Sequence, residues 1–87
     1  MGLTVDEFLR GLPGLAGGNP WVHEKGRVRL QMREGEVSMR LEPLPDRRLA
    51  ALSIPVTRIE IDLSALPGAA RKPFLARFDL HYRRGGG

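Results

Sequence analysis

The stretch RVRLQMREGEVSMRLE, residues 27–42, decides the predicted fold of this chain. If Glu34-Gly35 forms a two-residue turn, the two halves pair as an antiparallel hairpin. The apolar pairs, counted outwards from the turn, are Met32 with Val37, Leu30 with Met39, and Val28 with Leu41. All of them fall on one face, because strand side chains alternate with a period of two. The stretch therefore predicts a half-buried antiparallel sheet.

The opposite face of this hairpin is polar. Its predicted pairs are Arg33 with Glu36, Gln31 with Ser38, Arg29 with Arg40, and Arg27 with Glu42. Like charges directly opposite each other are unfavourable, so the pair Arg29–Arg40 needs compensation. Either a neighbouring strand that carries Glu60 and Asp62 supplies it, or an anionic partner does. We favour the neighbouring strand.

A second alternating segment at 57–63 predicts a further strand. Ile59, Ile61 and Leu63 point to one side of it, and Arg58, Glu60 and Asp62 point to the other. Between this strand and the hairpin, Pro43-Leu44-Pro45-Asp46 is expected to be a turn. Residues 47–54 alternate weakly and fit either a strand or one helical turn. Pro55 argues against a central strand at that point.

The N-terminal segment carries a strong helix start. Thr4 and Glu7 have the spacing of a capping box, and Leu3 and Phe8 have that of a hydrophobic staple. Gly11 and Pro13 are expected to end this helix, which gives the range 5–11. Residues 13–20, rich in glycine and proline, are expected to form a loop, and Trp21 after it to cover one edge of the core.

A second helix is predicted at about 69–84, since Phe74, Phe78 and His81 share one stripe and Leu75, Phe78 and Tyr82 share the next. Pro73 marks either the secure start of this helix or a kink in it. The glycines at 85–87 are expected to form a flexible tail. The whole chain, 1–87, then makes a single α+β domain of two layers. In it, an antiparallel sheet of three to four strands is covered on one face by both helices. The predicted core is Leu30, Met32, Val37, Met39, Ile59, Ile61, Phe74 and Phe78.

Composition bounds the class of protein. Eighty-seven residues give one modest core, and the absence of cysteine excludes disulfides and thiolate chemistry. No stretch approaches the roughly 20 apolar residues needed to cross a bilayer, so we expect a cytoplasmic protein without membrane contact. The net charge is +4, and the basic residues concentrate towards the C-terminus.

The sequence offers little for catalysis. The serines have no base at a recognisable spacing, and no phosphate-binding glycine pattern is present. Glu60 and Asp62 could act as an acid–base pair, but a solvated sheet face opposite arginines is the better interpretation. His23 and His81 each stand alone, and a structural role suits both. We therefore predict no enzyme, no catalytic residue, no metal site and no cofactor.

The leading functional hypothesis is a small binding or protein-interaction module. A short sheet with open edges tends to pair with another chain, so we expect a homo-oligomer or a larger protein as partner. A homodimer could form through strand edges or through the helix face. The alternative is a nucleic-acid-binding protein with a basic patch on the sheet and the last helix. Its candidate anion-binding residues are Arg29, Arg40, Arg71, Lys72, Arg83 and Arg84.

Overall fold

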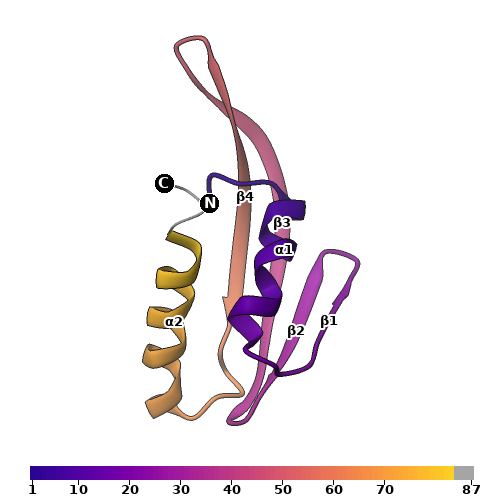
Figure 1. The fold of residues 1–87 in the computed structure, drawn as a ribbon, viewed down its shortest axis with the longest axis vertical. Helices are drawn as coiled ribbons and strands as arrows, with labels where there is room; N and C mark the ends of the chain where they lie inside the picture. Colours follow the sequence, from indigo (N-terminus) through magenta and orange to yellow (C-terminus); the bar gives the residue numbers. More distant parts are fainter. Residues whose placement is uncertain (84–87) are drawn as a thin grey trace.

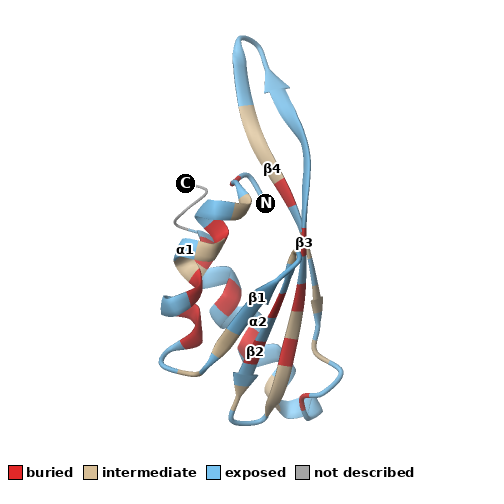
Figure 2. Ribbon diagram, turned by 90° about the vertical axis from the view of Figure 1, so that its right-hand side faces the viewer, coloured by how far each residue is buried: buried red, intermediate tan, exposed pale blue. Residues whose placement is uncertain are grey.

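The structure is a computed structural model, and it describes residues 1–83. The elements follow in the order α1 (Val5–Ala16), β1 (Trp21–Glu24), β2 (Arg27–Met32), β3 (Gly35–Leu49), β4 (Leu52–Asp62) and α2 (Gly68–Arg83). The strands form one antiparallel sheet in chain order, β1-β2-β3-β4. Both helices lie on the same face of this sheet (Figures 1 and 2). The predicted two-layer α+β fold is confirmed, with a four-stranded sheet.

The hairpin of β2 and β3 forms, but the predicted register is wrong by two residues. Met32 lies opposite Gly35, Leu30 opposite Val37, and Val28 opposite Met39, so Arg33 and Glu34 make the turn. A carbon added at Gly35 would lie 2.5 Å from the Ala65 carbonyl oxygen, so this glycine serves a close backbone approach rather than the turn. A shift of two keeps every side chain on its predicted face.

The helix α1 continues past its predicted end at residue 11, and residues 13–16 are helical rather than part of a loop. Thr4 and Glu7 form the predicted capping box. Gly11 and Gly14 lie inside the helix because α2 crosses there. A carbon added at Gly11 would meet the Tyr82 ring at 2.9 Å, and one at Gly14 would meet His81 at 2.7 Å. Burial of Leu12 and Leu15 offsets the hydrogen bond lost at Pro13.

The core lies between the helices and the near face of the sheet. The predicted core residues Leu30, Val37, Met39, Phe74 and Phe78 are buried, while Met32, Ile59 and Ile61 are half-buried against them. Trp21 packs against the core at the β1 edge, as predicted. The core also contains Leu3, Phe8, Leu12, Leu15, Ala16, Val28, Leu41, Leu66 and Tyr82. In the predicted stripe of Leu75, Phe78 and Tyr82, the two aromatic residues are buried, whereas Leu75 is 40% exposed, so the prediction is wrong for Leu75.

The expected turn at 43–46 is also wrong, because β3 runs through it to Leu49. Thr57 exchanges both backbone hydrogen bonds with Met1, on the side of β4 away from β3. Its partner Pro43 therefore points its nitrogen to the outer edge of β3. No N–H is needed there, because the pairing of β3 with the β2 side stops at Leu41, whose N–H donates to the Gly26 carbonyl. By the same alternation, Pro55 points its nitrogen to the outer edge of β4.

The ambiguous residues 47–54 belong to the two long strands and the turn that joins them. Ala50 adopts a positive φ of 55° in this turn. From the pair of Leu49 with Leu52 next to the turn, β3 and β4 are paired as far as Ser38 with Asp62. A register shift between Leu44 and Arg47 takes up one extra residue in β3. Pro73 lies inside α2, so the helix begins before it, at Gly68. Arg84 and the predicted tail at 85–87 lie outside the described residues.

The two helices are held together by aromatic rings. Phe8 stacks on Tyr82 with 4.6 Å between ring centroids, and Phe78 packs against both. The Tyr82 hydroxyl donates a buried 2.9 Å hydrogen bond to the carbonyl of Phe8. His81 makes a 2.7 Å hydrogen bond through Nε2 with the Gly11 carbonyl. Its role in these contacts is structural, as predicted.

This arrangement predicts a loss of stability in alkali. Burial raises the pKa of Tyr82 above its ordinary value of about 10. The unfolded chain releases this proton from about pH 10, whereas the folded chain retains it, so the free energy of unfolding falls as pH rises above that point. Because Tyr82 is the single tyrosine, tyrosinate absorbance reports it directly. We expect ionisation to accompany unfolding, and Tyr82→Phe to remove this part of the pH dependence. Ionisation near pH 10 in a fully folded protein would contradict the burial.

Candidate interaction surface

The upper part of the β3–β4 hairpin, residues 43–56, projects beyond the rest of the molecule, and we call it the arm (Figure 1). The molecule measures 44 × 25 × 21 Å, and the arm accounts for its elongation. In both views neither helix reaches the outer half of the arm (Figures 1 and 2). An isolated two-stranded ribbon is marginally stable in water, so the arm depends on its anchorage in the sheet.

Where the arm begins, the apolar side chains switch from the helix side of the sheet to the opposite side. In the lower part of β4, Ile59 and Ile61 point towards the helices, and Arg58, Glu60 and Asp62 point to solvent. Leu52, Ile54 and Val56 have the opposite parity, so they lie on the side that is polar over the rest of the sheet. Their partners across the ribbon are Leu49, Arg47 and Leu44. We call this side, made of Leu44, Arg47, Leu49, Leu52, Ile54 and Val56, the arm face.

The arm face is apolar and accessible. Leu44, Leu49 and Leu52 are 38%, 49% and 67% exposed, and Ile54 and Val56 are half-buried. The other side of the arm carries polar groups, with the Ser53 hydroxyl donating a 2.8 Å hydrogen bond to Asp46. Contiguous apolar patches on a small protein mark sites of interaction more often than isolated exposed leucines do.

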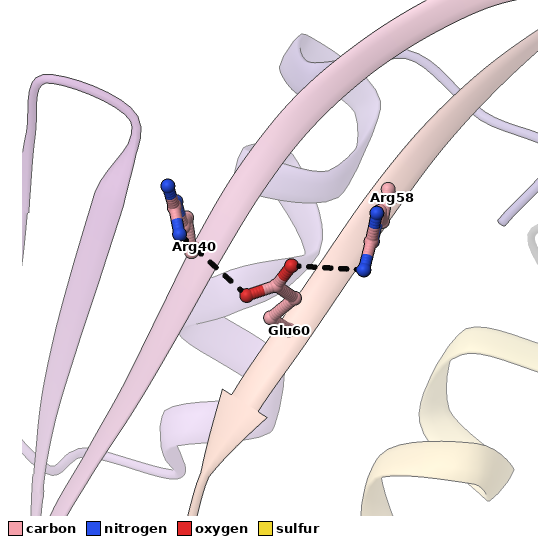
Figure 3. Close-up of polar contacts among 3 residues, drawn as sticks. All are labelled: Arg40, Arg58 and Glu60. Atoms are coloured by element: carbon pink, nitrogen blue, oxygen red, sulfur yellow. Dashed lines mark ion pairs between the residues drawn. The ribbon is translucent and has the colours of Figure 1, made fainter.

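Below the arm, the side of the sheet away from the helices is charged, and we call it the open face. Glu60 lies between two arginines there, 3.7 Å from Arg40 on β3 and 3.1 Å from Arg58 on its own strand (Figure 3). The predicted opposition of Arg29 and Arg40 is wrong, because Arg40 faces Arg27 and Arg29 faces Ser38. The predicted compensation of Arg40 by β4 is present through Glu60. Hydrogen bonds from Ser64 hold the pKa of Asp62 below its ordinary range.

The predicted anion-binding residues do not form one patch. Arg29 and Arg40 are exposed on the open face, whereas Arg71, Lys72 and Arg83 lie on α2 in the helix layer, on the other side of the sheet. Arg71 donates from Nε to the Leu66 carbonyl at 3.0 Å, which secures the loop before α2. Arg84 lies outside the described residues. The open face also carries acids between its arginines, which lowers its positive potential.

An apolar hollow of about 440 Å³ lies between the start of α2 and the β2–β3 turn, lined by Met32, Leu66, Pro67, Ala70, Pro73 and Phe74. Glu34 and Arg77 also border it. Within residues 1–83, no three histidine or acidic side chains come together in a way that could hold a metal ion. In that same part of the chain, neither helix has the length and apolar character needed to span a membrane.

Comparison with protein-family models, with curated protein sequences and with solved structures found no match to this chain. The candidate site therefore stands on its geometry alone. The arm face was not among the residues expected from sequence. The signal for it is a change of parity, from apolar residues at 52, 54 and 56 to apolar residues at 59, 61 and 63.

Proposed function

We propose that this protein is a small non-catalytic interaction module that binds a protein partner through the arm face. The observation that carries the proposal is the change of parity in β4. It moves the apolar side chains of the arm away from the protein's own core and onto the other side of the ribbon, where Leu44, Leu49 and Leu52 are exposed. Such a pattern has no use for the stability of the isolated chain, because these leucines remain in water.

The alternative, nucleic-acid binding, has less support. The candidate cations lie on two different sides of the sheet, and Glu60 already neutralises part of the charge on the open face. The arm itself carries Arg47 and Arg48 together with Asp46, a small positive excess for a phosphate-binding ribbon. A protein partner suits a mainly apolar surface with one charged side chain better.

The proposal can be tested by photo-crosslinking in cells. A photoreactive phenylalanine analogue placed at Leu52 should give adducts of discrete mass with a protein partner. The matched control is Leu80 on α2, which is 66% exposed against 67% for Leu52 but lies away from the arm. We expect adducts at position 52 and none at position 80. Equal labelling at both positions, or none at position 52, would overturn the proposal.

A further inference from the structure

We infer that the apolar hollow beside α2 is a binding site for a small apolar monocarboxylic acid, whose carboxylate is held by Arg77. The hollow lies between the start of α2 and the β2–β3 turn, at the end of the molecule opposite the arm (Figure 1). The inference therefore goes beyond the proposed function and does not depend on it.

The size and lining of the hollow are the first argument. Its volume of about 440 Å³ falls within the roughly 300–1,000 Å³ of ligand sites, which are mostly apolar and carry a few placed polar groups. Leu66 and Phe74, which are 3% and 5% exposed, line it together with Met32. On the α2 side it is bordered by Ala70 and Pro73. These side chains are short, so α2 leaves a space that a larger residue would fill.

The position of Arg77 is the second argument. Its guanidinium lies beside Gly17 at the C-terminal end of α1, where a carbon added to the glycine would be 2.5 Å from Nη2. The last turn of α1 contains no basic residue, so the helix dipole favours a cation there and holds Arg77 at the edge of the hollow. The dipole offers only about half a unit of negative charge. Within residues 1–83, Arg77 makes no ion pair.

Glu34 limits the charge of the ligand. Gly35 approaches the Ala65 carbonyl closely, so the turn that carries Glu34 is held against the loop before α2. Glu34 borders the hollow and, among the described residues, has no cationic partner. A ligand with a single negative charge can bind Arg77, whereas a phosphate dianion would be repelled more strongly by Glu34.

A carboxylate suits this pair of side chains better than an ammonium group does. The planar guanidinium of Arg77 can donate two parallel hydrogen bonds to a carboxylate, and its place beside α1 fixes its orientation. An ammonium group would have only a point contact with Glu34, on an exposed turn, and would be repelled by Arg77. The edge of the hollow is exposed at Pro67 and Ala69, so part of the ligand stays in water. We expect a Kd on the order of 1 mM.

Proton–nitrogen correlation NMR of the whole chain, with octanoate as the probe, tests the inference. We expect saturable shift changes confined to the signals around the hollow, including those of Met32, Ala70 and Phe74. Octanol has the same carbon chain without the charge and should bind roughly threefold or more weakly, since it lacks the contact with Arg77. Octylammonium should bind more weakly still.

Two substitutions on α2 separate the charge from the space. Arg77→Gln should raise the Kd for octanoate roughly threefold or more, whereas Lys72→Gln removes the same charge outside the hollow and should leave the Kd unchanged. Ala70→Leu should fill the hollow and abolish saturable binding, and Ala76→Leu is its matched control on the exposed side of α2. If Ala70→Leu does not fold, Ala69→Leu places the same side chain at the exposed edge of the hollow.

Three outcomes would overturn the inference: no saturable shift changes with octanoate up to about ten times the expected Kd, equal binding of octanoate and octylammonium, or equal effects of the substitutions at 77 and 72. Leu52→Asp, in the arm, should bind octanoate like the wild type. If octanoate does not bind but position 52 still crosslinks to a protein, the inference fails and the proposed function stands. If octanoate binds as expected but position 52 crosslinks to nothing, the proposed function fails and the inference stands.

Discussion

Replacing Met39 with aspartate should abolish the cooperative unfolding transition. Met39 is 1% exposed in β3, between Val28 on β2 and Ile61 on β4. A carboxylate there has no cationic partner, and burying an unpaired charge or forcing its protonation costs several kcal/mol. A domain of this size has a total stability of about 4–13 kcal/mol at the usual roughly 0.05–0.15 kcal/mol per residue. This loss is therefore a large share of the free energy of unfolding.

Two controls separate the charge from the position. Met39→Leu keeps volume and polarity and should cost less than about 1.5 kcal/mol. Arg29→Asp places the same carboxylate on the adjacent strand, on the exposed side, and should leave the urea transition cooperative. Circular dichroism during urea unfolding measures all three variants. A Met39→Asp protein with a wild-type transition would show that the assigned faces of the sheet are wrong.

Replacing Phe8 with alanine should have the next largest effect. Phe8 is fully buried and stacks on Tyr82, with Phe78 at 6.1 Å between ring centroids. Truncation of a buried phenylalanine costs about 3–5 kcal/mol, from lost burial and from the cavity left behind. It also removes the contact on which α1 depends, because a 12-residue helix is marginal without packing.

The control for Phe8 is leucine, which fills most of the space. Phe8→Leu should retain a cooperative transition at a cost clearly below that of Phe8→Ala, with both values taken from urea unfolding. If the two variants are equally stable, the ring contacts contribute little, and the aromatic cluster does not hold the helices together. If Phe8→Ala resembles the wild type, α1 is not docked as described.

The sequence predicted the faces of the elements better than their limits. The faces assigned to the side chains of β2 and β3 from their period of two are correct despite the error of two residues in register, because the same side chains stay inside. The predicted ends of the helices and strands were wrong where glycine and proline were interpreted from their immediate neighbours alone. Gly11 and Gly14 serve the contact with Tyr82 and His81, and that contact involves residues about 70 positions away.

The arm was missed for a related reason. Pro43 and Pro45 indicate a turn when the segment is considered alone, but both lie in a strand paired on one side only. The candidate cations were chosen by charge, and their grouping depends on which side of the sheet each occupies. The side of the sheet on which each cation lies depends on how α2 packs across the sheet, and no local sequence pattern contains that information. The change of parity at Thr57 was available in the sequence, and its meaning follows only once β3 and β4 are known to be long.

The two prolines at the borders of the arm have a consequence for solubility. A long, uncovered ribbon with leucines on one side can act as a template for fibril growth, since each free edge can recruit another strand. Pro43 and Pro55 leave gaps in the two ladders of N–H donors where such recruitment would start. The protein can thus expose the arm face to water at high concentration without starting the growth of cross-β fibrils.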